Sequence, residues 1–158
     1  MKAFYSRAMT VLATGLGLGY RPIASGTVGT LWGVAIVVLL FRVLTIKWQI
    51  AAAVLMTVAS YFICDEGERT FKTKDDGRIV ADEYLAYPIS MIGLAGPAIG
   101  VRPEAVLVSF LTFRFFDIVK PPPANRMQGL EGGLGVVADD VVAALYSLAA
   151  NYLILWLL

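Results

Sequence analysis

Long apolar runs, separated by short polar segments, dominate this chain of 158 residues. The apolar fraction is 58% and the charged fraction is only 16%, whereas ordinary globular proteins have roughly 45–50% apolar and about 25% charged residues. The charges cluster between the apolar runs instead of covering one face of every helix. This pattern favours a single membrane domain over residues 1–158. A soluble all-helical bundle with an unusually apolar core is the alternative.

Five apolar stretches are candidates for membrane helices. They cover residues 28–46, 48–64, 84–101, 103–118 and 138–158. Some are shorter than the roughly 20 residues that a spanning helix needs, so we expect tilting, local thinning of the bilayer or partial insertion. The predicted fold is all-α: a compact helical membrane bundle with about five apolar helices. Residues 1–19 predict a re-entrant or interfacial segment, since three glycines interrupt a run that would otherwise resemble a secretory signal.

The basic residues predict an orientation in the membrane, because Lys and Arg concentrate at the cytoplasmic ends of spanning helices. With the N-terminus inside, ten of the 13 basic residues fall in cytoplasmic segments. The other three are Arg42, Lys47 and Arg102. We therefore expect the polar segments between the helices to gather on the cytoplasmic face.

The chain contains no histidine, which limits its chemistry. Ser-His-Asp and Cys-His catalysis and histidine-ligated zinc are excluded. The one cysteine, Cys64, cannot form an internal disulfide and is expected to be a small buried side chain. A net charge of +1 without a free basic stripe predicts no nucleic-acid partner. Carboxylate, lysine, arginine and hydroxyl groups remain, and a hard oxygen-binding cation such as Mg²⁺ suits them.

A segment rich in glycine and threonine, residues 21–30, precedes the first apolar helix. The start of a helix offers free backbone N–H groups and the positive end of the helix dipole, which both suit phosphate. The segment lacks the spacing and the lysine of a full phosphate-binding loop. Taken alone, it therefore favours Thr27 as a helix cap over Thr27 as a phosphate contact.

Two acidic pairs lie at the borders of apolar runs, Asp82-Glu83 and Asp139-Asp140. Acids at a helix start are stabilised by the helix dipole, which would give them a purely structural role. However, ionisable groups at a membrane edge are costly and are usually functional. Adjacent aspartates also repel each other, and a divalent cation is the simplest compensation. We therefore favour a site at both pairs.

Arg114, Asp117 and Lys120 recur at intervals of three residues, so a helix would place them in one slowly drifting stripe. Pro121 is expected to end this helix at Lys120. A self-neutralising Arg114–Asp117 pair is the alternative to a functional role. Under the predicted orientation this stripe lies on the same membrane face as the acidic pairs, where its two cations could neutralise phosphate oxygens.

Four motifs, taken together and in this order, resemble the phosphatidylglycerophosphatase A family of bacterial membrane phosphatases. They are PIASGTVGT at 22–30, IVADE at 79–83, FRFFDIVKP at 113–121 and GGLGVVADD at 132–140. The resemblance implies a multi-pass, mostly helical enzyme of the bacterial inner (plasma) membrane, with its active site on the cytoplasmic face. It implies Mg²⁺-dependent hydrolysis of phosphatidylglycerophosphate to phosphatidylglycerol and inorganic phosphate, a step of phospholipid biosynthesis.

The resemblance also implies roles for ten residues. The candidate catalytic residues, which are also the candidate metal ligands, are Asp82, Glu83, Asp117, Asp139 and Asp140. The candidate phosphate contacts are Gly26, Thr27, Gly29, Arg114 and Lys120. Our hypothesis is direct attack of water on the phosphomonoester, with Asp117 or Glu83 as the general base and with the acyl tails left in the bilayer. A route through an aspartyl-phosphate is the rival mechanism.

A small cation transporter or channel subunit, whose membrane-edge carboxylates bind the permeating ion, is the alternative from a different class. It accounts for the acids but gives no role to the Gly-Thr segment or to Lys120. A phosphotransferase that exchanges lipid headgroups is a third hypothesis. Release of free phosphate would separate it from a phosphatase.

Overall fold

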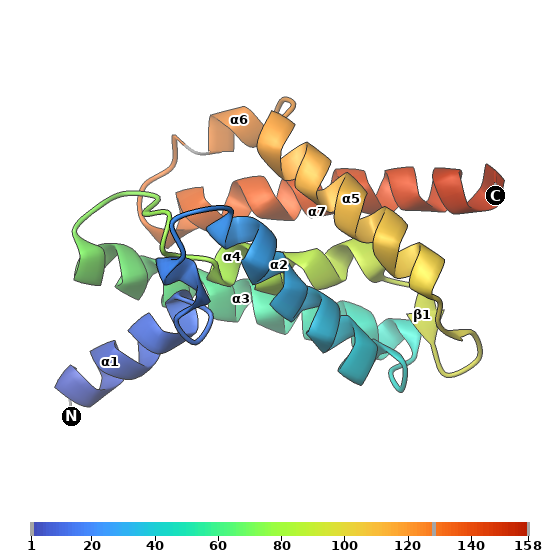
Figure 1. Ribbon diagram of the computed structural model, residues 1–158, viewed down its shortest axis with the longest axis horizontal. Helices are drawn as coiled ribbons and strands as arrows, with labels where there is room; N and C mark the ends of the chain where they lie inside the picture. The colour runs from blue at the N-terminus through green and yellow to red at the C-terminus, as the bar shows by residue number, and fades with distance from the viewer. Residues whose placement is uncertain (1, 128, 158) are drawn as a thin grey trace.

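The computed structural model describes residues 2–127 and 129–157 of the chain, and most of them are helical. Figure 1 shows the arrangement of the elements. In chain order they are α1 (Lys2–Ala13), η1 (Leu18–Tyr20), α2 (Ser25–Ile36), η2 (Val37–Phe41), α3 (Ile46–Phe71), α4 (Ala81–Ala86), η3 (Tyr87–Met91), β1 (Ala95–Gly96), β2 (Gly100–Val101), α5 (Pro103–Val119), α6 (Ala124–Met127) and α7 (Gly133–Leu157). The predicted helical fold is confirmed, with one short antiparallel hairpin, β1–β2, as an addition.

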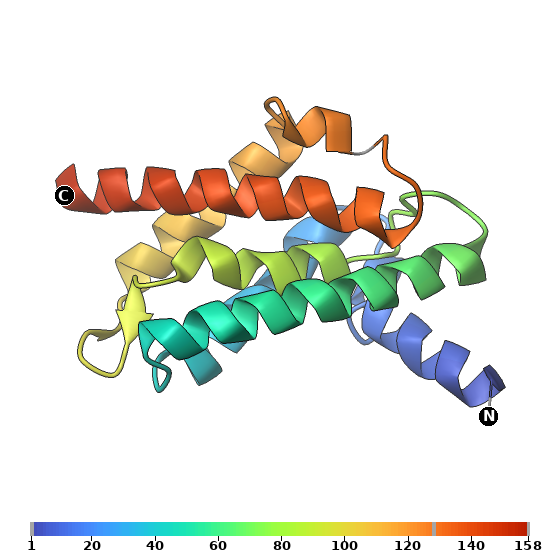
Figure 2. The same ribbon diagram turned by 180° about the vertical axis from the view of Figure 1, so that it is seen from behind.

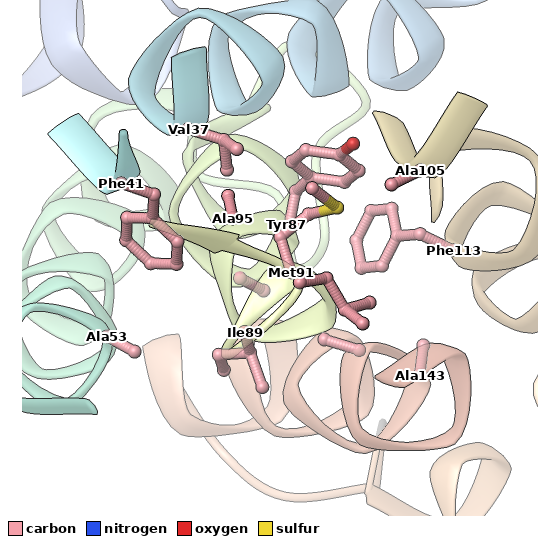
Figure 3. Packing of buried hydrophobic residues seen from close by; sticks show 13 residues of the cluster. Val37, Phe41, Ala53, Tyr87, Ile89, Met91, Ala95, Ala105, Phe113 and Ala143 are labelled. Carbon is pink, nitrogen blue, oxygen red and sulfur yellow. The ribbon is translucent and has the colours of Figure 1, made fainter. Parts of the chain in front are cut away.

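The short helices α4 and η3 follow each other through the middle of the bundle. Seen from behind, they lie between the long helices α3 and α7 (Figure 2). The helices α2 and α5 cover the opposite side (Figure 1). The main apolar core surrounds η3, where the rings of Tyr87 and Phe113 meet edge to face with centroids 5.7 Å apart (Figure 3). Because most of α4 and all of η3 are buried, the start of α4 is packed among the surrounding helices.

Within the described residues, two helices are long and apolar enough to cross a membrane, α3 and α7. The predicted number of about five such helices is not confirmed. The helix formed by α2 and η2 is shorter, and α5 has 17 residues. The boundaries also differ, because α3 and α7 extend beyond the predicted stretches 48–64 and 138–158.

The stretch 84–101 is not one helix, and its prediction was wrong. The chain is helical only as far as Met91 and then turns into the hairpin. Gly93 and Gly100 adopt positive φ, a conformation that helices do not use. The buried Gln49 side chain satisfies the freed backbone, since its Nε2 donates to the oxygen of Ala95 at 2.7 Å and its Oε1 accepts from the N–H of Gly93 at 2.9 Å. Hydropathy alone cannot report such contacts.

The outer faces of α3 and α7 carry large exposed apolar side chains. Leu55 of α3 and Leu153 of α7 are 70% and 59% exposed. Water-soluble proteins rarely expose continuous apolar faces of this kind, and such faces are typical of contact with a membrane or a partner. The surface therefore favours the membrane prediction over the soluble bundle.

Gly33 allows α2 to approach η3 closely. A Cβ at this position would lie 2.7 Å from the Cβ of Tyr87 and 3.1 Å from the oxygen of Tyr84. We expect Gly33→Ala to destabilise the fold by about 1–3 kcal/mol through overpacking. Thermal unfolding in detergent measures this, with Gly77→Ala as the control because a Cβ there has no atom within 4 Å. Equal midpoints for the two variants would contradict the prediction.

Candidate active site

The starts of α2, α4 and α7 and the end of α5 lie at the same end of the bundle (Figure 1). They carry one group of charged side chains. The α5 helix ends at Val119, and Lys120 follows in the left-handed conformation with φ 46°. The predicted stop before Pro121 is therefore confirmed. The start of α4 is fixed by Val80, whose N–H donates to the oxygen of Ala13 at 2.8 Å.

Three carboxylates face one another at the centre of this group, Asp82 and Glu83 from α4 and Asp140 from α7. One oxygen of each lies within 4.8 Å of the other two. Asp82 Oδ1, Glu83 Oε2 and Asp140 Oδ2 are buried and have no hydrogen-bond partner among the described residues. Buried anionic oxygens without a partner are costly, and hard divalent cations prefer oxygen ligands of this type. The three-carboxylate cluster therefore fits a divalent cation such as Mg²⁺.

The two acids of α4, Asp82 and Glu83, have raised pKa values because they are buried near other carboxylates. Burial, followed by the negative charge of Asp140, raises the pKa of Glu83 to about 8. Burial, followed by the charge of Glu83, raises the pKa of Asp82 well above its usual value. In the metal-free protein, protons therefore relieve the repulsion that a bound cation would otherwise relieve.

Arg114 of α5 places its guanidinium beside the cluster. Its Nη1 lies 2.5 Å from Asp117 Oδ2 and 4.0 Å from Glu83 Oε1. The Nε of Arg114 is buried and has no partner among the described residues. The ion pair considered as the structural alternative is therefore present, but it leaves one donor of the guanidinium unused. A phosphate oxygen is a suitable acceptor for such a donor.

Lys120 and Asp139 form a second ion pair at the edge of the cluster. Lys120 Nζ lies 2.5 Å from Asp139 Oδ2, and Asp139 Oδ1 accepts a hydrogen bond from the N–H of Asp140 at 3.1 Å. Both oxygens of Asp139 thus have partners, as does the oxygen of Asp117 that faces Arg114. Of the five predicted ligands, the structure brings Asp82, Glu83 and Asp140 together. Asp117 instead forms an ion pair with Arg114, and Asp139 forms one with Lys120.

The first turn of α2 is open towards the cluster. The helix begins at Ser25 after Ala24, and no side chain caps it, so the prediction of Thr27 as the cap was wrong. Thr27 lies inside the helix because the helix starts three residues earlier than a Thr27 cap requires. The N–H of Val28 is bonded to the oxygen of Ala24 at 3.0 Å. The N–H groups that precede it have no helical acceptor and can bind an anion.

The two predicted glycine contacts have different surroundings. A Cβ at Gly26 would overlap Glu83 Oε1 and would lie 3.2 Å from Arg114 Nη1. A Cβ at Gly29 would instead lie 2.7 Å from the Cβ of Val80. Gly26 therefore lies at the cluster, whereas Gly29 allows α2 to pack against the residue that precedes α4.

Thr30 is a site residue to which the sequence assigned no role. It is fully buried, its Oγ1 donates to the oxygen of Gly26 at 2.9 Å, and Arg114 Nη1 donates to it at 3.4 Å. Its position four residues after Gly26 was the available signal, because residues i and i+4 share one face of a helix.

Comparison with known proteins gives the family. Residues 11–155 match the family described as Phosphatidylglycerophosphatase A, which covers most of the chain. The chain belongs to this family. The predicted resemblance is therefore confirmed, and the protein is an enzyme of the phosphoric monoester hydrolase class.

Curated relatives agree along nearly the whole length. The chain is 33% identical to the phosphatidylglycerophosphatase A of Haemophilus influenzae, over 94% of the chain and 90% of that protein. It is 29% identical to that of Escherichia coli, over 91% and 81%. It is 35% identical to a Bacteroides thetaiotaomicron protein named as a proposed phosphatidylinositol-3-phosphatase, over 87% of each. No solved structure matches the chain.

Proposed function

We propose that this phosphatidylglycerophosphatase A family member hydrolyses phosphatidylglycerophosphate to phosphatidylglycerol and inorganic phosphate, with Mg²⁺ as cofactor, in phospholipid biosynthesis. The observation that carries the proposal is the three-carboxylate cluster, in which one oxygen of each residue lies within 4.8 Å of the other two and each residue has a buried oxygen without a partner among the described residues. The guanidinium of Arg114, whose Nε likewise has no partner among those residues, lies beside it. The names of two of the three relatives support this headgroup. The alternative of a cation transporter has no support from the family or from these relatives.

Asp82, Glu83 and Asp140 would hold the metal, because their unpartnered oxygens form its natural ligand set. When bound, Mg²⁺ would polarise a phosphoryl oxygen and lower the pKa of water in the site.

The phosphate group would be held by donors from two helices. Arg114 would use its free Nε, and the first turn of α2 would offer the N–H groups of Gly26 and Thr27. Lys120, oriented by Asp139, would add a second positive charge. These donors stabilise the negative charge that spreads over the phosphoryl oxygens in the transition state.

In the proposed reaction, the oxygen of water attacks phosphorus opposite the ester oxygen, and the bond between phosphorus and that oxygen breaks. The water loses a proton to Asp117, and the leaving oxygen takes a proton from solvent water, so that the products are the alcohol and inorganic phosphate. We favour Asp117 over Glu83 as the base, because Glu83 belongs to the three-carboxylate cluster whereas Arg114 holds Asp117 in place beside it. This route forms no covalent phosphoenzyme, so a radiolabelled phosphoprotein trapped during turnover would contradict it.

The proposed setting is the bacterial inner (plasma) membrane, with several passes and with the charged cluster on the cytoplasmic face. The lengths of α3 and α7 and the exposed apolar side chains on them support this setting. The α5 helix, at 17 residues, would be about 25 Å long and could cross the bilayer only where the bilayer is locally thin. A phospholipid substrate would keep its acyl tails in the bilayer while its headgroup reaches the cluster.

Phosphate release by the purified protein in detergent micelles tests the proposal. We expect release from phosphatidylglycerophosphate to require Mg²⁺, to stop with EDTA, and to exceed release from phosphatidylinositol 3-phosphate by about tenfold or more. Faster release from phosphatidylinositol 3-phosphate would instead indicate that the enzyme prefers the inositol headgroup, which is the one in the name of the Bacteroides relative. Transfer of the headgroup without free phosphate would indicate a phosphotransferase. A folded protein that releases phosphate from neither lipid would contradict the proposal.

A further inference from the structure

A groove of about 740 Å³ lies along α1, away from the three-carboxylate cluster. The wall opposite α1 comes from the η1 region and from the end of α3. One cation, several hydroxyl groups and apolar side chains line it; the residues that matter below are Ser6, Arg7, Thr10, Val11, Leu16 and Thr70. The function proposed above gives this groove no role.

The groove carries an uncompensated positive charge. Arg7 is exposed, and among the residues that the structure describes, no acidic side chain lines the groove or pairs with Arg7. The whole of α1 contains no acidic residue. Since a guanidinium is a planar fork of donors that matches phosphate geometry, a phosphate group suits this groove.

One hydroxyl group that lines the groove has a proton without an acceptor among the described residues. Thr10 Oγ1 donates to the oxygen of Ser6 at 2.8 Å. The hydroxyl oxygens of Ser6 and Thr70 lie 3.3 Å apart and share one hydrogen bond, which uses one of their two protons. The other proton is available to an acceptor bound in the groove that Arg7 also lines.

Apolar side chains continue the groove towards the outside of the molecule. Val11 and Leu16 line it, and Leu16 is 64% exposed. At the other end of α1, Phe4 is 80% exposed. A cation and a hydroxyl donor beside an exposed apolar surface match the two parts of a phospholipid, the anionic headgroup and the acyl chains, and are typical of helices that lie at a membrane interface.

The groove is at the same end of the bundle as the cluster. The oxygen of Ala13 accepts from the N–H of Val80, and the oxygen of Leu12 accepts from Tyr84 Oη, both at 2.8 Å. Through these bonds the end of α1 is attached to the helix that carries Asp82 and Glu83. A lipid whose headgroup reaches the groove would therefore come from the same leaflet as a lipid whose headgroup reaches the cluster.

We infer that the groove along α1 is a second lipid site, which binds the phosphate of an anionic phospholipid of the surrounding bilayer and is separate from the three-carboxylate cluster. None of the three cluster carboxylates lines the groove, so binding there can be measured separately from binding at the cluster. The inference does not depend on which headgroup the enzyme hydrolyses.

Native mass spectrometry of the detergent-solubilised protein tests this inference, because it counts bound lipids. The protein is titrated in EDTA with dioleoylphosphatidylserine or with dioleoylphosphatidylcholine, so that no turnover occurs and the cluster holds no metal. We expect one phosphatidylserine to bind about tenfold more tightly than phosphatidylcholine. In Arg7→Gln this preference should disappear, whereas Arg7→Lys should keep part of it because the charge remains.

Arg126→Gln is the matched control, since Arg126 is an exposed arginine outside the groove. It should keep the wild-type preference. Arg7 is on the surface, so loss of folding is not expected, and unchanged unfolding temperatures would verify this. Equal binding of the two lipids by the wild-type protein would overturn the inference. An unchanged preference in Arg7→Gln would overturn it as well. Because no substrate is turned over, neither result depends on the proposed phosphatase activity.

Discussion

Asp140→Asn is expected to lower phosphate release by about 1,000-fold while raising the thermal stability of the metal-free protein. Asp140 is the one member of the three-carboxylate cluster that comes from α7, and its Oδ2 is buried without a partner. An asparagine has nearly the same shape but cannot supply an anionic ligand. The cluster would lose metal affinity and, with it, the charge that the reaction needs.

The gain in stability has a separate cause. Three buried carboxylates that face one another repel and lack hydration, so a neutral side chain at position 140 relieves both costs. The wild-type protein should in turn be stabilised by Mg²⁺, because a ligand that binds only the folded state raises its apparent stability. In Asp140→Asn this stabilisation should be lost. Activity and stability therefore change in opposite directions.

Two measurements check the Asp140→Asn prediction: phosphate release, and thermal unfolding in detergent with either EDTA or Mg²⁺. Asp75→Asn is the control, because Asp75 is an exposed aspartate in a turn, and asparagine tolerates its left-handed conformation. Its activity and its response to Mg²⁺ should match the wild type. A variant at position 140 that unfolds earlier in EDTA and still releases phosphate would show that Asp140 has a structural role only.

The sequence was sufficient to predict the helical class and most members of the charged cluster. The acids at 82, 83 and 140 border apolar runs. This position is itself the physical signal, because an ionisable group at a membrane edge is costly and is usually functional. The end of α5 was also predictable, because the proline at 121 acts through local sterics. Both are local properties of the chain, which explains why a sequence can reveal them.

The features that were missed depend on contacts between distant segments. The pairing of Asp139 with Lys120 becomes visible only when α7 is docked beside the end of α5. The different surroundings of Gly26 and Gly29 likewise depend on how α2 meets α4. The hairpin after η3 is held by Gln49, a residue more than forty positions earlier in the chain. Apolar runs and spacing rules contain no information about such tertiary partners.

Arg114→Gln is expected to lower kcat/KM by about 100-fold, mainly through kcat. Arg114 lies beside the cluster, at 4.0 Å from Glu83 Oε1, and its Nε, which has no partner among the described residues, is the donor proposed for a phosphoryl oxygen. Negative charge on the phosphoryl oxygens is redistributed as the ester bond breaks, so a fixed guanidinium contributes more in the transition state than in the bound substrate.

A loss of rate in Arg114→Gln could also arise because Asp117 is left without its partner at 2.5 Å. Arg114→Lys separates the two causes, because an ammonium can still neutralise Asp117 but cannot reproduce the planar fork. We expect Arg114→Lys to recover most of the unfolding temperature and to remain about tenfold below the wild type in kcat. Arg102→Gln, which removes an exposed arginine paired with Glu104, is the control and should retain full activity. If Arg114→Lys regained both stability and rate, the guanidinium would be needed only as a counter-ion for Asp117, and the phosphate would have to be held by Lys120 and the first turn of α2.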